Sequence, residues 1–175
     1  MNIEVIDNFL DPHEFEELKD FIFHPDENSN MRMNWVMNYG VTNADEDSFQ
    51  FNHMFYADGA PQSDQMNLLV PILTKIPNLL SMLRIKANLL TRTLNHEQHG
   101  YHVDMHDAQG LPHKSAIFYC NTNNGWTQFE NGTKVESIAN RMVMFDGQLK
   151  HCSVSQTDEP FRVVINFVYI EKRVM

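Results

Sequence analysis

Four residues of this 175-residue chain have side-chain types and a spacing that could bind a metal ion and an anion. One residue separates His102 from Asp104, so on an extended segment both side chains project from the same face and can reach one ion. His151 lies further along the chain, and ten residues separate it from Arg162. Each pair is a weak signal alone, but both pairs fall on expected strands in one consistent order.

Two histidines and one carboxylate leave coordination positions of a metal open, which is the arrangement of non-haem iron(II) oxygenases. The sequence therefore predicts His102, Asp104 and His151 as iron ligands. A dicarboxylate such as 2-oxoglutarate that binds iron at one end leaves its other carboxylate buried, and a guanidinium can hold that carboxylate bidentately. Arg162 precedes an apolar run at 163–168, which indicates burial on both strand faces. Because a buried arginine requires an anion, Arg162 is the predicted 2-oxoglutarate contact.

The second half of the chain carries the strands that must position these residues. From residue 84, Ile85, Ala87 and Leu89 alternate with polar residues, which is a strand signature. Further short segments separated by turn residues predict strands around 101–106, 115–121, 126–129, 133–138, 141–146, 149–154 and 161–170. This succession of strands indicates a sandwich or a barrel.

The first half of the chain is expected to support that β core. A strand at 3–6 precedes a helix, for which Asp11 is the expected N-cap and Glu14 the partner in a capping box. Residues 26–65 are predicted to be irregular, and their many aromatic rings either cover the core or form a substrate lid. A second helix is expected over 64–76.

These elements predict a mainly β protein with N-terminal helices in an α+β arrangement. The chain is interpreted as a single domain over residues 1–175. Residues 1–83 form its helical support and substrate lid, and residues 84–175 form its all-β core.

Composition excludes several classes of function. The chain has 13 basic and 23 acidic residues and a formal net charge of -10, which disfavours nucleic-acid binding because phosphate contacts need clustered Lys and Arg. No apolar run approaches the length of a membrane span, and the N-terminus does not resemble a signal peptide, so no membrane association is expected. Two cysteines are too few for a disulfide framework, which favours a reducing cytoplasm.

Over residues 89–170 these features resemble the 2-oxoglutarate/Fe(II) oxygenases, especially the prolyl-4-hydroxylase-like branch. The resemblance lies in His102-Val103-Asp104, in the segments 115–121 and 141–146, and in His151 through Arg162. Residues 154–169 are also similar to short phage-encoded oxygenases of marine type. The resemblance implies a double-stranded β-helix, which is a jelly-roll with a cupin-like core. It further implies a dioxygenase that uses Fe(II), 2-oxoglutarate and O2, with ascorbate as a supporting reductant.

The implied reaction is hydroxylation of a peptidyl proline or a small amino-acid-like substrate, with release of succinate and CO2, in the host cytoplasm if the chain is phage-encoded. The resemblance places Tyr119 at the far carboxylate of 2-oxoglutarate. Strand alternation adds Asn166 and Ser153 as inward-facing co-substrate contacts. Candidate substrate contacts are Trp35, Tyr39, Tyr101 and His106. Two alternatives remain open at this point. One is a cupin-type metal enzyme that does not use 2-oxoglutarate, and the other is a non-catalytic jelly-roll binding module.

Overall fold

A computed structural model describes residues 3–23, 33–41, 48–105 and 111–172, which form two antiparallel sheets and short helices. The main sheet has the strand order β1-β9-β6-β11-β5-β3-β2, and β4 pairs with β3 at its edge. Its strands are β1 (Glu4–Ile6), β2 (Val36–Tyr39), β3 (Phe49–Ala57), β4 (Ala60–Pro61), β5 (Leu79–Thr91), β6 (Lys114–Tyr119), β9 (Arg141–Asp146) and β11 (Phe161–Glu171). The minor sheet consists of β10 (His151–Val154), β7 (Trp126–Phe129) and β8 (Lys134–Glu136). This is the expected jelly-roll core.

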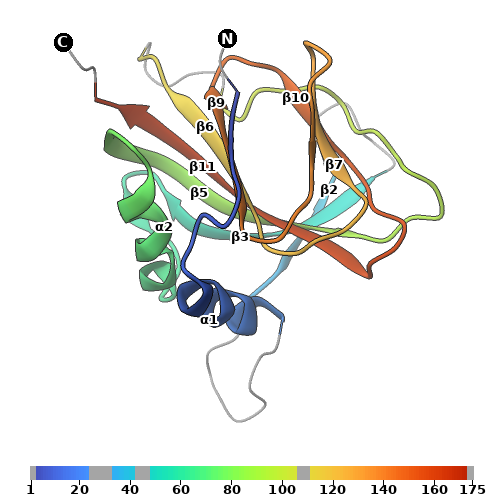
Figure 1. The fold of residues 1–175 in the computed structure, drawn as a ribbon, viewed down its shortest axis with the longest axis horizontal. Helices are drawn as coiled ribbons and strands as arrows, with labels where there is room; N and C mark the ends of the chain where they lie inside the picture. Colours follow the sequence, from blue (N-terminus) through green and yellow to red (C-terminus); the bar gives the residue numbers. More distant parts are fainter. Residues whose placement is uncertain (1–2, 24–32, 42–47, 106–110, 173–175) are drawn as a thin grey trace.

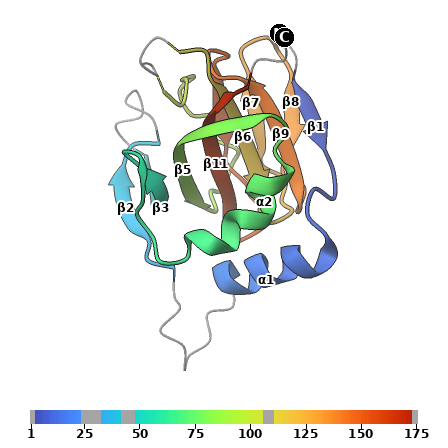
Figure 2. The same cartoon turned by 90° about the vertical axis from the view of Figure 1, so that its left-hand side faces the viewer.

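The helices lie on one side of the main sheet, and the minor sheet lies on the other (Figure 1, Figure 2). They are α1 (Pro12–Phe23), the 3-10 helix η1 (Met66–Leu69) and α2 (Val70–Lys75). The layers enclose two hydrophobic clusters. The larger cluster joins the helices to the outer face of the main sheet, and the smaller fills the space between the sheets. No helix in the described part of the chain is both long enough and apolar enough to cross a bilayer.

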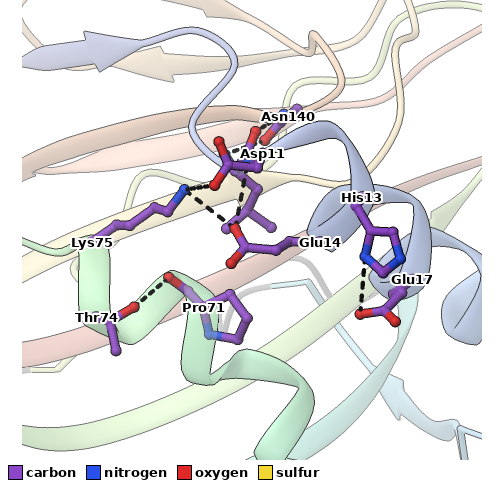
Figure 3. A network of polar contacts seen from close by, with 9 residues as sticks. Asp11, His13, Glu14, Glu17, Pro71, Thr74, Lys75 and Asn140 are labelled. Atoms are coloured by element: carbon purple, nitrogen blue, oxygen red, sulfur yellow. Dashed lines mark hydrogen bonds and ion pairs between the residues drawn. The ribbon is translucent and has the colours of Figure 1, made fainter.

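Helix α1 begins where the sequence predicts, but its N-terminal contacts differ from a full capping box. The Glu14 carboxylate accepts a hydrogen bond from the Asp11 backbone N–H at 3.3 Å, as the motif requires. The Asp11 carboxylate instead pairs with Lys75 at the end of α2, at 2.9 Å, and Lys75 also lies 3.2 Å from Glu14 (Figure 3). The side-chain amide of Asn140 binds the backbone N–H and C=O of Leu10, each at 2.8 Å. These contacts therefore join α1 to α2, and they join the segment before α1 to the loop before β9.

The first half of the chain contains more strand than expected. Where residues 26–65 were expected to be irregular, the structure has β2, β3 and β4, and β3 pairs with β5 to widen the main sheet. The interpretation of residues 1–83 as helical support is therefore wrong for this part. Residues 49–52 alternate aromatic with polar side chains, which is a strand pattern that the Asn-, Asp- and Met-rich composition obscured.

The strand expected at 101–106 is not formed in the described part of that segment, residues 101–105. The described residues there form only an isolated bridge between His102 and His151. The remaining predicted strands of the second half are present, and β5 begins earlier than expected, at Leu79.

Candidate metal centre and anion pocket

A cavity of about 610 Å³ opens between the two sheets. Its walls come from β5 and β11 of the main sheet, from β10 and β7 of the minor sheet, and from the segment 101–104. Because strand side chains alternate between faces, β5 and β11 each contribute every second residue of a stretch to the wall. The four residues predicted from their spacing all line this one cavity.

Backbone pairing brings the two histidines together. The His102 N–H donates to the His151 carbonyl at 2.9 Å, and the His151 N–H donates to the His102 carbonyl at 3.0 Å. Residues that exchange both hydrogen bonds in an antiparallel pair project their side chains from the same face. The two imidazole rings consequently lie 4.8 Å apart between centroids. Asp104 completes the group, and one ligand atom from each of the three residues lies within 4.8 Å of the others.

Backbone carbonyls orient both imidazoles. His102 Nδ1 lies 3.2 Å from the Gly100 carbonyl oxygen, and His151 Nδ1 lies 3.2 Å from that of Leu149. A carbonyl can only accept, so Nδ1 carries the proton and Nε2 keeps its lone pair, as in most histidine metal ligands. Burial lowers the pKa of His102, which favours its neutral form.

Two donors hold one oxygen of Asp104. Arg84 Nη2 and Asn166 Nδ2 each donate to Asp104 Oδ1 at 3.2 Å. Burial opposes ionisation of Asp104, but opposing contributions, among them the charge of Arg84, outweigh it and keep the pKa of this carboxyl below its ordinary value. The carboxylate is thus charged, and its second oxygen, Oδ2, is directed toward His151 Nε2 at 3.6 Å.

The donor set fits a ferrous ion. Asp104 Oδ2 and His151 Nε2 are buried and have no hydrogen-bond partner among the described residues. Buried polar atoms almost always have a partner, so these two indicate a ligand. Two neutral imidazoles and one carboxylate on one side of a metal are typical of non-haem iron(II) sites.

Arg162 forms a separate anion pocket in the same cavity. It is 2 % exposed, and its guanidinium donates to Ser137 Oγ at 2.8 Å and to Thr127 Oγ1 at 3.2 Å. Tyr119 donates its hydroxyl hydrogen to Thr127 Oγ1 at 2.8 Å, and its ring lies 5.7 Å from the guanidinium carbon. Burial lowers the pKa of Arg162. No carboxylate among the described residues pairs with this buried cation, although burying an unpaired charge is costly.

Gly125 permits the approach of the chain to Arg162. A Cβ atom at this position would lie 2.8 Å from the Val154 carbonyl oxygen and 3.1 Å from Arg162 Cδ. A side chain here would displace either the backbone of β10 or the arginine. Only glycine lets the turn before β7 close over the anion pocket.

The other predicted site residues are placed as follows. Ser153 lines the cavity, and so does Tyr101, which is 42 % exposed. Trp35 and Tyr39 are not part of the cavity wall. Trp35 packs against the larger hydrophobic cluster, and Tyr39 is 85 % exposed on the edge strand β2. The candidate substrate contact His106 lies outside the described residues.

Sequence reasoning missed Arg84, Thr127 and Ser137. The alternation along β5 gave a usable signal for Arg84, because it separates an apolar face from a polar face, and the polar face lines the cavity. Thr127 and Ser137 are ordinary strand and loop residues, and nothing in their local sequence distinguishes them.

Comparison with known proteins identifies the fold. No family model and no curated protein matches the sequence. A 2OG-Fe(II) oxygenase family oxidoreductase from Burkholderia pseudomallei matches with a TM-score of 0.68 at 11% identity, over 98% of this chain and 86% of that chain. The viral collagen prolyl hydroxylase of Paramecium Bursaria Chlorella virus-1 matches with a TM-score of 0.59 at 11% identity, over 98% and 91%. The epimerase SnoN of nogalamycin biosynthesis, in complex with Fe3+ and alpha ketoglutarate, matches with a TM-score of 0.60 at 13% identity, over 97% and 78%.

These neighbours share the fold of 2-oxoglutarate/Fe(II) oxygenases with this chain. The resemblance in the sequence is thus confirmed at the level of the fold. Fold likeness at such low identity does not define the reaction, which must be argued from the site.

Proposed function

We propose that the protein is a 2-oxoglutarate- and O2-dependent Fe(II) dioxygenase that hydroxylates a peptidyl proline or a small amino-acid-like substrate. One oxygen atom of O2 enters the substrate C–H bond, and the other enters 2-oxoglutarate, which is oxidised to succinate and CO2. One observation carries the proposal. A single cavity contains three converging metal donors and, separately, a buried arginine without an anionic partner among the described residues.

Three cavity residues would bind the metal, and two others would position one of them. His102, Asp104 and His151 would hold the metal, with Asp104 binding through Oδ2. Arg84 and Asn166 hold the other carboxylate oxygen, Oδ1. Ferrous iron, when bound with 2-oxoglutarate, supplies the activation of O2 that oxidises a C–H bond.

The anion pocket orients the co-substrate. Arg162 would bind the far carboxylate of 2-oxoglutarate, and the Tyr119–Thr127 pair would fix the position of the guanidinium. A charge-assisted contact in a buried pocket is strong and geometrically specific. The apolar side chains of Leu90, Ile117 and Val164 line the cavity and limit access of water to the co-substrate.

The two alternatives account for fewer of these features. A metal enzyme without 2-oxoglutarate, or a binding module without a metal, gives no reason for a buried arginine beside a converging His–Asp–His group. The neighbours support the oxygenase class, since SnoN is described with Fe3+ and alpha ketoglutarate bound and the viral neighbour is a collagen prolyl hydroxylase.

Anaerobic titration tests the proposal. Protein loaded with ferrous iron is titrated with 2-oxoglutarate while the metal-to-ligand charge-transfer absorption is followed. The expected result is a saturable band that requires both iron and 2-oxoglutarate and that Arg162→Met weakens. Absence of the band in the wild-type protein at saturating iron and 2-oxoglutarate would end the proposal.

A further inference from the structure

A second set of polar side chains lines the cavity on β5, away from the anion pocket. In the register of β5 with β11, Leu90 lies opposite Arg162, and Lys86 lies opposite Asn166. Lys86 lies four positions before Leu90, which is about 13 Å along a strand. Lys86 therefore lies beside Asn166 and far from Arg162 along the sheet. Asn166 in turn contacts Asp104, one of the proposed metal ligands.

Two of these side chains lack partners among the described residues. Asn88 is 9 % exposed, and its Oδ1 atom has no hydrogen-bond partner. Lys86 is half-buried in the cavity wall and forms no ion pair with a described carboxylate. Arg84, the third polar residue on this face, is already paired with Asp104. Since buried polar groups normally have partners, this part of the wall presents one donor and one acceptor to a ligand.

The charge of the cavity also indicates a ligand. Arg84, Lys86 and Arg162 face it from the main sheet, whereas Asp104 is the one carboxylate in its described wall. Lys150 also lines the cavity, but it is paired with Glu130 at 3.6 Å. A ferrous ion would add two positive charges, and 2-oxoglutarate would add two negative charges. Both carboxylates of the diacid then have partners, one in Arg162 and one in the metal, so neither balances Lys86. The excess of positive charge is confined to the cavity, because the whole chain carries a formal net charge of -10.

We infer that Lys86 and Asn88 bind the primary substrate, and that this substrate is a small carboxylate-bearing molecule of the free amino-acid class. Lys86 binds its carboxylate, and Asn88 Oδ1 accepts a hydrogen bond from its ammonium or amide N–H. A proline within a polypeptide has neutral amides on both sides and offers no anion to Lys86. The inference rests on the proposed function, because the charge is counted with iron and 2-oxoglutarate in place.

Calorimetric titration under anaerobic conditions tests the inference without turnover. Protein loaded with ferrous iron and 2-oxoglutarate is titrated with the common free L-amino acids and with their N-acetyl methylamides, which lack both charges. At least one free acid is expected to bind at least about tenfold more tightly than its neutral counterpart. Lys86→Met is expected to weaken that binding by about 10- to 100-fold, and Lys86→Arg to retain most of it.

Lys114→Met is the matched control. Lys114 is also a half-buried strand lysine of the main sheet, but it lies outside the cavity wall and pairs with Glu171 at 3.9 Å. Its substitution is expected to leave both affinities unchanged.

Three outcomes overturn the inference. They are failure of every free acid to bind, equal binding of acids and neutral amides, and weakening of 2-oxoglutarate itself by Lys86→Met, which would assign Lys86 to the co-substrate. Failure of the proposed function is read separately, as a wild-type protein that does not bind 2-oxoglutarate in the presence of iron.

Discussion

Both faces of strand β11 are buried, but the two faces differ in how completely their groups are satisfied. On the outer face, Ile165 and Phe167 are fully buried in the cluster formed with the helices. On the inner face, Arg162 has no anionic partner among the described residues, and Asn166 Oδ1 has no hydrogen-bond partner there. Along β11, outward-facing residues thus stabilise the fold, and the inward-facing residues between them line the binding cavity. Substitutions on one face should change the free energy of unfolding, and those on the other should change affinity and activity.

The largest expected effect is on the inner side of the molecule. His151→Ala removes one of the three proposed metal ligands and should lower 2-oxoglutarate-dependent succinate formation at least about 1000-fold, which corresponds to about 4 kcal/mol. Iron content per chain and succinate release are the measurements. His96→Ala is the matched control, because His96 lies outside the His102–Asp104–His151 group, with its Nδ1 2.7 Å from the Ser155 carbonyl oxygen and its ring tilted by 59° against Trp126. Full iron occupancy in His151→Ala would remove His151 from the ligand set.

Phe167→Ala should have the opposite profile. It removes a fully buried ring from the outer face and is expected to lower the free energy of unfolding by about 3–5 kcal/mol. Affinity for 2-oxoglutarate per folded molecule should not change. Urea unfolding measures the first quantity and anaerobic titration the second. A loss below about 1 kcal/mol would show that the outer face does not stabilise the fold as its burial indicates.

Arg162→Met sharpens the comparison, because it should lower the affinity for 2-oxoglutarate and raise the free energy of unfolding. The Kd for 2-oxoglutarate should rise about 100-fold with loss of a buried charge-assisted contact. The free energy of unfolding of the ligand-free protein should increase by about 1 kcal/mol, since an unbalanced buried cation is removed. Arg141→Met is the control, because Arg141 lies outside the cavity wall and pairs with Asp7. Destabilisation of ligand-free Arg162→Met by several kcal/mol would contradict the division between the two faces.

Asn166→Ala should produce a smaller, indirect loss. Asn166 acts on Asp104 Oδ1 and does not belong to the His–Asp–His group, so iron affinity should fall about tenfold. Competition with a chelator of known affinity gives the measurement. Asn38→Ala on the exposed strand β2 provides a reference substitution. If the two variants bind iron equally well, the Asn166 contact does not orient Asp104.

The smallest effect is expected at the surface. Arg141 holds the exposed Asp7 carboxylate at 2.6 Å, and this hydrogen bond lowers the pKa of Asp7. A lowered folded-state pKa adds stability above the unfolded pKa of about 3.9, and this stability is lost as the pH falls through the folded pKa. Asp7→Asn should therefore cost about 0.2–1 kcal/mol at neutral pH and less in acid. Thermal unfolding at several pH values measures the difference, and a constant difference down to strongly acidic pH would contradict it.

The strands of the β core, the burial of Arg162 and the shared side of His102 and Asp104 could be predicted because each depends on short-range regularity. The spacing of His102 and Asp104 predicts that an extended segment directs both side chains to one side, and the apolar run at 163–168 indicates that both faces of β11 are buried. The convergence of His151 with His102 required the jelly-roll topology, which the resemblance implied.

What could not be predicted depends on contacts between distant segments. Ser137 meets Arg162 across 25 residues, and Arg84 meets Asp104 across 20 residues, without any local pattern that marks the pairs. The strands β2 and β3 were missed because their composition resembles that of a loop. Trp35 and Tyr39 were expected near a substrate on account of their ring type. Tyr39 instead ends the edge strand β2 of the main sheet, and Trp35 directly precedes that strand.

The paired hydrogen bonds between His102 and His151 have a consequence for the dynamics of the site. They are formed in an isolated bridge, so the segment that carries His102 and Asp104 is not part of a continuous strand there. A metal ion bound by both imidazoles would link the same two residues a second time, through their side chains. Local opening of the segment would then have to break the backbone hydrogen bonds and the metal–histidine bonds together. Amide protection of these two histidines against hydrogen exchange is therefore thermodynamically linked to metal occupancy.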